Sequence, residues 1–206
     1  MSVTPEPARN DATASDPGGG PSSEGIDAAA KAARKGPPPV HLWNPDYCGE
    51  MDLLIRADGT WMHEGTPIGR PALVRLFASI LKREGDRYFL VTPVEKLGIT
   101  VEDAPFRAVD MEPESEGLVF ETDMGDVVTA GPDHAIRMEW SPDGEPAPYL
   151  HVRRGLEAKI DRKTFYRMVE LGETMAVDGE DWFGVRSGGT FFPLIRQADL
   201  EAGQAV

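Results

Sequence analysis

Two arginines stand at positions where a bound anion would offset an unfavourable charge. Arg70 and Arg162 occupy matching places at the starts of two segments in which apolar residues recur at helical spacing. A cation at the start of a helix lies beside the positive end of the helix dipole, which is unfavourable. Because this placement occurs twice, the sequence suggests an anion that compensates for it.

Further basic and aromatic residues precede or begin the second of these segments. Arg153 and Arg154 stand in an expected hairpin just before it, with Tyr149 and Lys159 nearby. The guanidinium group is the side chain best shaped for carboxylate or phosphate. We therefore expect an anionic small molecule or an acidic protein partner here. The candidate ligand-binding residues are Arg70, Tyr149, Arg153, Arg154, Lys159 and Arg162.

The charge distribution allows a purely structural alternative for these arginines. Residues 88–148 carry 3 basic against 14 acidic side chains, whereas residues 67–87 and residues 149–170 each have a net charge of +3. The arginines could therefore pair with carboxylates of the acidic middle segment and join the two halves of the chain. An exposed ion pair contributes only about 0–1 kcal/mol, so this role requires a network of several pairs.

Residues for catalysis or metal binding lack the spacing that such chemistry requires. The sequence contains no phosphate-binding glycine motif between a strand and a helix and no G-x-S-x-G motif. Its histidines are scattered, without an H-E-x-x-H motif, and no base can be named for the thiol of Cys48. The acidic alternation over 110–116 is interpreted as a solvated loop. We predict a protein that is not an enzyme and has no catalytic residue, metal or cofactor.

The composition argues against other classes of protein. The 206 residues carry 21 Lys and Arg against 35 Asp and Glu, a net charge of −14, which argues against general nucleic-acid binding. The single cysteine excludes an intramolecular disulfide. No apolar run is long enough to span a membrane, and the N-terminus lacks the pattern of a secretory signal. These features predict a cytoplasmic protein.

The N-terminal segment differs in composition from the rest of the chain. Residues 1–39 hold 7 of the 18 prolines, 5 glycines and no aromatic residue. Such a segment buries too little apolar surface to offset the entropy of ordering it, so we expect a disordered tail. An alanine-rich stretch at 24–35 is the exception, with Ser22 and Ser23 as candidate caps. It predicts a short helix that forms when docked.

The remaining chain predicts alternating strands and helices. Hairpins are expected over 51–63 and 149–160, the first around an Asp-Gly turn. One helical stripe begins at Pro71 and is ended by Gly85 and the aspartate after it. Asp161 caps a second helix. Further strands are expected over 87–92, 118–122, 127–130, 135–140, 175–177, 182–185 and 190–192.

The order hairpin, helix, strand occurs twice along the chain. The two helical segments align with a shift of 92 residues, which places Arg70 on Arg162. We therefore predict an α+β fold of two related subdomains, residues 40–110 and the β-rich residues 111–195, followed by a frayed end at 196–206. The alternative is that any two α+β halves share amphipathic helices and aromatic strands.

Several strings of residues, in order, are similar to a known bacterial family. They are Trp43-Asn44-Pro45, Asp58-Gly59-Thr60-Trp61, Arg70-x-x-Leu73-Val74, Leu90-Val91-Thr92-Pro93-Val94-Glu95-Lys96, Glu102-Asp103-Ala104-Pro105-Phe106, Pro148-Tyr149-Leu150-His151-Val152-Arg153 and Leu156-Glu157-Ala158. Over residues 40–195 the chain thus resembles domain-of-unknown-function family 1285. The resemblance implies a duplicated α+β core whose second domain is superficially like a pleckstrin-homology fold. It also implies a binding site at the domain interface and a part in signal transduction, and it supplies no catalytic residues.

The sequence leaves three classes of function open. The first hypothesis is a non-enzymatic binding or regulatory protein with an anionic ligand or partner at the interface of its subdomains. The alternative is an adaptor that binds proteins through its C-terminal sheet and whose arginines are structural. The third is an enzyme acting on an acidic metabolite. The ligand, the partner and the oligomeric state are not specified by the sequence.

Overall fold

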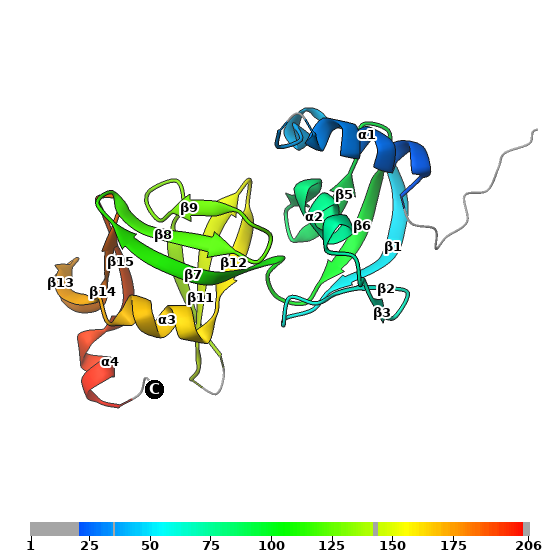
Figure 1. Ribbon diagram of the computed structural model, residues 1–206. Helices are drawn as coiled ribbons and strands as arrows, with labels where there is room; N and C mark the ends of the chain where they lie inside the picture. The colour runs from blue at the N-terminus through cyan, green and yellow to red at the C-terminus, as the bar shows by residue number, and fades with distance from the viewer. Residues whose placement is uncertain (1–20, 35, 142–143, 204–206) are drawn as a thin grey trace, which may run out of the picture.

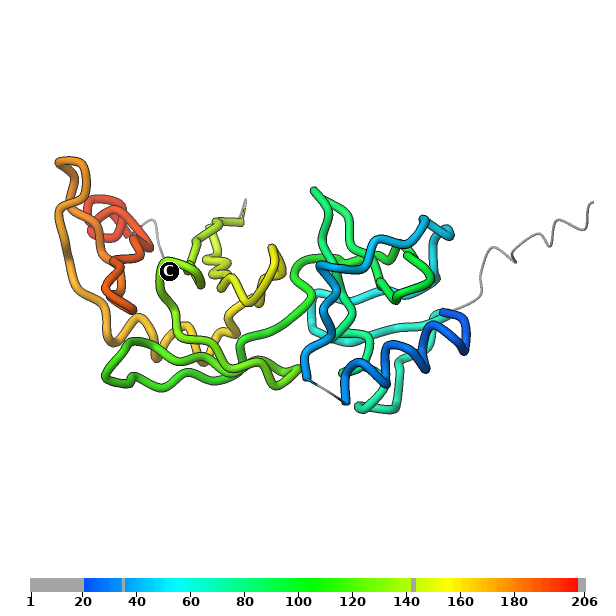
Figure 2. The backbone as a smooth tube through the Cα atoms, turned by 90° about the horizontal axis from the view of Figure 1, so that it is seen from above, coloured from blue at the N-terminus to red at the C-terminus, as the bar shows by residue number. Residues whose placement is uncertain are grey.

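The computed structural model describes residues 21–34, 36–141 and 144–203. Its elements fall into two groups that lie side by side (Figure 1). The first domain comprises the elements before residue 104, and the second domain comprises those after it. The same division is visible from above (Figure 2).

The first domain is built on a six-stranded sheet. Its strands follow the order β3-β2-β1-β6-β5-β4, in which β1 and β6 are parallel and the other neighbours are antiparallel. Alternate residues Met51, Leu53 and Ile55 of β1 are buried, as expected for a strand with one face on the core. The strands are β1 (Tyr47–Ile55), β2 (Trp61–His63), β3 (Thr66–Pro67), β4 (Leu81–Glu84), β5 (Arg87–Val91) and β6 (Lys96–Val101).

The predicted hairpin around the Asp-Gly turn is confirmed. β1 and β2 pair antiparallel, with Ile55 opposite Trp61. Gly59 adopts a φ of +86°, a conformation that favours glycine, and the side chain of Asp58 accepts a bond from the Thr60 N–H at 2.8 Å. Local turn chemistry therefore determines this part of the sheet.

Part of the expected tail is ordered as a helix on the first domain. The helix α1 (Ser23–Ala33) begins after Ser22, whose hydroxyl accepts a bond from the Gly25 N–H at 3.1 Å. Ser22 also donates two bonds to Glu95, and Ala29 is fully buried. The short helix expected within the tail at 24–35 is thus present, and Ser22, one of its two candidate caps, begins it. Residues 1–20 lie outside the described residues.

The second helix ends earlier than its apolar stripe predicts. The helix α2 (Pro71–Ser79) starts at the expected proline, and Ile80 and Leu81 are buried beyond its end. Leu81 begins β4, and Gly85 forms the β4–β5 turn with a φ of +60°. A hairpin thus replaces the last helical turn, because strand pairing satisfies the backbone there. A short 3-10 helix, η1 (Val40–Leu42), precedes β1.

A second six-stranded sheet carries the second domain. Its strands follow the order β10-β11-β12-β7-β8-β9, with β12 and β7 parallel and the other neighbours antiparallel. The expected acidic loop at 110–116 is largely strand, since β7 extends to Glu114. The strands are β7 (Phe106–Glu114), β8 (Gly117–Thr122), β9 (Val127–Thr129), β10 (Ile136–Trp140), β11 (Pro146–Arg153) and β12 (Leu156–Ile160).

The end of the described chain adds a helix and a small sheet. Asp161 caps α3 (Arg162–Val169) as predicted, its carboxylate accepting the Thr164 N–H at 2.8 Å. A three-stranded antiparallel sheet follows, and α4 (Gln197–Glu201) replaces the expected frayed segment over those five residues. The strands of this sheet are β13 (Glu173–Val177), β14 (Glu180–Ser187) and β15 (Thr190–Arg196).

The predicted α+β fold with a duplicated core is confirmed, but the repeat has a different register. Each large sheet consists of two three-stranded meanders. The first strand of the first meander pairs in parallel with the last strand of the second, β1 with β6 and β7 with β12. This topology equates β1–β6 with β7–β12 rather than 51–92 with 149–192. The predicted match of Arg70 with Arg162 is therefore not supported by the sheets. The expected boundary at 110/111 falls inside β7, so the domains divide before Phe106.

Buried apolar residues connect both domains. A single cluster contains Leu53, Ile55 and Phe77 of the first domain and Phe106, Phe120 and others of the second. Burial of apolar side chains is the main favourable contribution to folding, so the cluster stabilises both domains together. No helix in the described part of the chain is long and apolar enough to cross a membrane.

Candidate functional site

Two of the predicted site residues, Tyr149 and Lys159, are brought together at the domain junction. They are opposite each other on β11 and β12, so their side chains share one face of the sheet. The Tyr149 hydroxyl donates to one carboxylate oxygen of Asp103 at 2.6 Å, and the Lys159 Nζ lies 2.6 Å from the other. Asp103 belongs to the segment between β6 and β7. Both residues therefore hold the connection between the domains.

Arg153 has a structural environment. Its guanidinium group donates to the Ala78 carbonyl at 3.0 Å, forms an ion pair with Asp126 and lies 4.8 Å above the Phe106 ring. These contacts join the end of β11 to α2 of the first domain. These contacts fit the alternative in which Arg153 joins the two halves of the chain better than a role in binding an external anion.

Arg154 lies next to this junction on a strained turn. Its φ of +48° is uncommon for a residue with a side chain, and its guanidinium group reaches the Pro38 carbonyl at 3.5 Å. Partial burial, followed by the charge of Arg153, lowers its pKa. Arg154 thus connects the second domain to the segment before η1.

The two arginines at helix starts differ. Arg70 is the exposed N-cap of α2, and its side chain makes no capping bond. Arg162 is the first residue of α3, and its Nε donates to the Tyr166 hydroxyl at 3.0 Å, a bond that raises the Arg162 pKa. Of the four predicted arginines, Arg162 lines the large pocket described next and the other three do not. The structure therefore places one of the four arginines at this pocket and places Arg153 and Arg154 at the contact between the domains.

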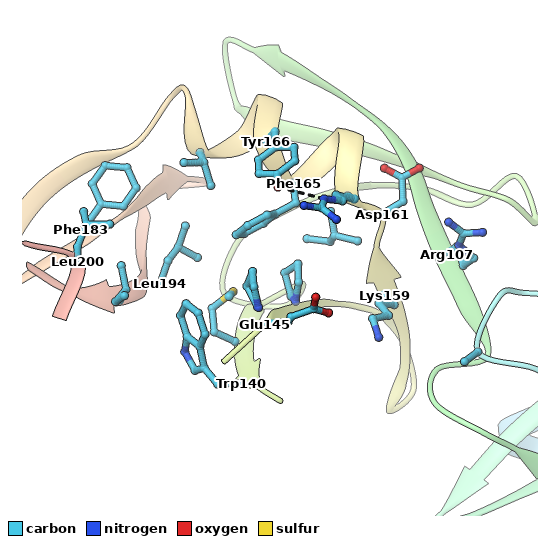
Figure 3. A pocket seen from close by; sticks show the side chains of 18 of the residues that line it. Arg107, Trp140, Glu145, Lys159, Asp161, Phe165, Tyr166, Phe183, Leu194 and Leu200 are labelled. Carbon is cyan, nitrogen blue, oxygen red and sulfur yellow. Dashed lines mark hydrogen bonds between the residues drawn. The ribbon is translucent and has the colours of Figure 1, made fainter. Parts of the chain in front are cut away.

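A pocket of about 510 Å³ opens in the second domain. It lies between the core face of β10–β12, the helix α3, and the small sheet with α4 (Figure 3). The β1–β2 turn of the first domain closes one end. Its lining residues with apolar or largely apolar side chains are Ala57, Met138, Trp140, Pro146, Pro148, Ile160, Phe165, Tyr166, Val169, Phe183, Leu194, Ile195 and Leu200.

Strand alternation explains why this pocket and the junction use the same three strands. Met138 pairs with Pro148 and Trp140 with Pro146, and these residues face the pocket. Tyr149 and its neighbours at odd positions point to the opposite face, toward the first domain. One face of β10–β12 therefore builds the junction and the other builds most of the pocket wall, although Lys159 of the junction face lines the pocket as well.

The pocket has a charged end. Figure 3 places Arg107, Lys159 and Asp161 on one side, away from Phe183 and Leu200. Arg107 donates to the Asp58 carbonyl at 2.9 Å. Among the described residues, neither Arg107 nor Arg162 forms an ion pair with a carboxylate.

Three carboxylates also line this end. Asp161 is occupied in capping α3, and Asp58 accepts the Thr60 N–H, a bond that lowers the Asp58 pKa. Glu145 is exposed and close enough to Arg162 to raise the Arg162 pKa weakly. The end is therefore mixed in charge, but its guanidinium groups have donors that no carboxylate occupies.

A network of ion pairs lies on the junction face of the same strands. Glu157 accepts two bonds from Arg137, at 2.5 and 2.8 Å, and lies 3.5 Å from Arg83 of β4. The Arg137 guanidinium stacks 4.2 Å from the Tyr149 ring. Burial and the bond to Asp103 raise the Tyr149 pKa. A network of ion pairs that joins the two halves of the chain is therefore present, as the structural alternative for the arginines requires. Most of its residues were not among the candidate ligand-binding residues.

Several lining residues were not predicted as site residues. Arg107 lies in the acidic segment, and Leu200 lies in the stretch expected to fray. Trp140, at the end of a predicted strand, was a signal available in the sequence, since large aromatic residues are common in binding pockets. His134 and His151 stack with ring centres 5.9 Å apart, but the described residues contain no group of three potential metal ligands.

Comparison with known proteins identifies the family. Residues 38–104 match the N-terminal domain, and residues 105–194 the C-terminal domain, of the family described as domain of unknown function DUF1285. These limits meet immediately before β7, at the boundary that the sheets indicate. No curated protein matches the chain.

Crystal structures of two DUF1285 family proteins are similar to the chain to different degrees. A DUF1285 family protein from Silicibacter pomeroyi DSS-3 is 56% identical, with a TM-score of 0.77 over 87% of this chain and 100% of that chain. A DUF1285 family protein from Shewanella baltica OS155 is 35% identical, with a TM-score of 0.48 over 58% of this chain and 91% of that chain. The family suggested by the sequence strings is confirmed: the chain belongs to the DUF1285 family.

Proposed function

We propose that the protein binds a small anionic ligand at the charged end of the pocket and acts by binding rather than by catalysis. The observation that carries this proposal is Arg162, which lines the pocket and donates to a tyrosine hydroxyl. No carboxylate pairs with it among the described residues. In a chain with a net charge of −14, this leaves guanidinium donors for an external anion.

The position of the charged end supports a regulatory role. Arg107 comes from β7 and donates to the Asp58 carbonyl in the β1–β2 turn of the first domain. A ligand that binds Arg107 competes with or reinforces this bond, so its binding energy is coupled to the domain junction. We infer that a part in signal transduction would act through this coupling.

A thermal-shift screen with nucleotides, phosphorylated metabolites, dicarboxylates and alkyl carboxylates tests the proposal. A ligand at about 100 times its Kd stabilises a protein by about 2.7 kcal/mol. For a chain of this length, that corresponds to a rise in Tm of roughly 5–10 °C. The proposal predicts such a rise with at least one class of anion.

Three variants locate the site. Arg162→Ala should weaken the binding of that anion at least tenfold, because hydrogen bonds to charged groups contribute about 1.5–3 kcal/mol. Arg70→Ala is the matched control, since Arg70 also stands at a helix start but does not line the pocket. Glu145→Gln should tighten binding, because it removes a negative charge near Arg162 that repels the anion. Equal affinities of the two arginine variants, or no anion that raises the Tm, would contradict the proposal.

The alternative role as an adaptor rests on a different observation. Within the described part of the chain, the strand β13 pairs with β14 alone, so its other edge can accept an extended peptide. A photo-crosslinking residue at the exposed Ala176 of β13 tests it against the same residue at exposed Leu171. A partner captured from Ala176 only, with pocket ligands unable to compete, would favour the adaptor.

A further inference from the structure

We infer that the ligand is an amphipathic anion, an unbranched acyl chain with a terminal carboxylate, and that the apolar part of the pocket holds the chain. This inference rests on the proposed function, because the charged end must first hold the head group. It adds the chemical class of the ligand. Its basis is the division of one pocket into two chemically different ends (Figure 3).

The end away from the charged residues is built by apolar side chains. Phe183, Leu194, Ile195 and Leu200 come from the small sheet and α4, and Val169 comes from the end of α3. None of these side chains has a hydrogen-bond donor or acceptor. A sugar or a nucleobase placed there would lose its bonds to water without replacement, which costs free energy. A hydrocarbon chain loses nothing of this kind and gains from burial.

Two large aromatic side chains that line the pocket are exposed to solvent. Trp140 is 41% exposed and Tyr166 is 46% exposed, although both line the pocket. Tyr166 also holds Arg162 through its hydroxyl, so the apolar wall and the cationic group meet at this residue. A ligand with a chain against the rings and a carboxylate at the guanidinium group would cover both.

The size and the charge of the pocket fit such a molecule. Its volume of about 510 Å³ lies within the usual range of small-molecule pockets, roughly 300–1,000 Å³. Arg107 and Arg162 provide planar donor groups that match a carboxylate. The carboxylate of Glu145 near Arg162 disfavours a head group with several negative charges. A single carboxylate therefore fits better than a polyphosphate.

Isothermal titration with butanoate, hexanoate, octanoate and decanoate, all below their micelle concentrations, tests the inference. Burial of each methylene contributes about 0.8 kcal/mol, so affinity should rise about fourfold per carbon until the apolar end is filled. Octanol and octylamine have the same tail without the anion, and both should bind at least tenfold more weakly than octanoate. Inorganic phosphate and a nucleoside triphosphate serve as anions without a tail.

Two tryptophan variants separate the tail from the head group. Val169→Trp fills the apolar end and should weaken octanoate more than butanoate. Leu171→Trp is the matched control, because Leu171 is exposed two residues away and does not line the pocket. Circular dichroism and the unliganded Tm establish that each variant folds. Loss of octanoate binding in the first variant alone supports the inference.

The outcomes distinguish this inference from the proposed function. If butanoate or phosphate binds as tightly as octanoate and Arg162→Ala weakens it, the acyl chain is refuted while the anion site stands. If octanol binds as tightly as octanoate and no other anion binds, the pocket recognises apolar ligands only and both are refuted. If a nucleotide binds and no carboxylate does, the acyl chain is refuted and the nucleotide takes its place in the proposed function.

Discussion

Glu157 provides the sharpest test of how the two domains are held together. Its carboxylate faces Arg137 of the same sheet and Arg83 of the first domain. Glu157→Gln retains the shape of the side chain but removes its charge. Two guanidinium groups then lose their shared counter-charge at the junction, so we expect the variant to unfold more readily than the native protein.

The size of the effect follows from geometry and exposure. Removing one partner of a fully buried ion pair costs about 3–5 kcal/mol, whereas an exposed pair contributes about 0–1 kcal/mol. The Glu157 side chain is 17% exposed and that of Arg137 is 41% exposed, with two hydrogen bonds between them. An intermediate loss of about 2 kcal/mol is expected, which lowers the Tm of a chain of this size by roughly 4–8 °C.

A double-mutant cycle isolates the pair. Urea unfolding of Glu157→Gln, Arg137→Gln and the double variant should give a coupling energy of about 1–2 kcal/mol. The matched control is Arg186 with Glu173, at 3.0 Å but with side chains 53% and 51% exposed. Its coupling should be below about 0.5 kcal/mol. A coupling at Glu157 no larger than in this control would refute the reasoning.

The pH dependence is an independent check on the same carboxylate. The bonds from Arg137 lower the Glu157 pKa below its ordinary value of 4.5, although burial opposes them. A lowered pKa in the folded state stabilises the protein above the unfolded value, and this stabilisation is lost as the pH falls through the folded value. The difference between native protein and Glu157→Gln should therefore be full at neutral pH and shrink below about pH 4. A difference that persists in acid would contradict an electrostatic origin.

Two further substitutions test the docked helix and the partly buried carboxylate of Asp123. Gly25→Ala would ordinarily stabilise a helix, but its methyl group would overlap the carboxylate of Glu95. That carboxylate would have to move and would lose the two bonds that Ser22 donates to it. It should therefore cost about 1–2 kcal/mol in urea unfolding and raise hydrogen exchange in α1, while Asp27→Ala on the exposed face has no such effect. Burial raises the Asp123 pKa, so its ionisation costs stability that grows as the pH rises from the unfolded pKa to the raised folded pKa and is constant above it. Asp123→Asn should be more stable than the native protein at neutral pH, and this gain should vanish in acid; a constant difference would refute it.

Elements with local signals could be predicted from the sequence. The Asp-Gly turn, the capping Ser22 and the capping Asp161 each act within a few residues. Such signals depend on backbone conformations and hydrogen bonds that neighbouring residues provide. The first hairpin, α1 and the start of α3 were therefore predicted correctly.

Elements that depend on distant partners could not be predicted in this way. The strand β7 contains Pro113 and several acidic residues, but it pairs in parallel with β12, which begins 50 residues after Phe106. The end of α2 is likewise set by the pairing of β4 with β5. Strand propensity reports how a residue fits its neighbours in the sheet, and those neighbours are not adjacent in sequence.

The candidate site was predictable only in part. The unfavourable charge at a helix start directed attention to Arg162, which lines the pocket, and also to Arg70, which does not line it. Arg107 reaches the charged end from a strand whose surroundings in sequence are acidic. The distances that matter connect residues from Ala57 to Leu200, and no spacing along the chain encodes them.

The duplication itself explains why the pocket lies in the second domain. The sheets β1–β6 and β7–β12 have the same topology. Among the described residues, a helix connects the two meanders in the first domain, where α2 lies between β3 and β4, and none does so in the second. In the second domain, α3, the small sheet and α4 follow β12 and have no counterpart after β6. These additional elements pack over the core face of β10–β12 without filling the space beneath them. Different elements thus complete the two copies of the repeat, and we expect binding where the second copy differs from the first.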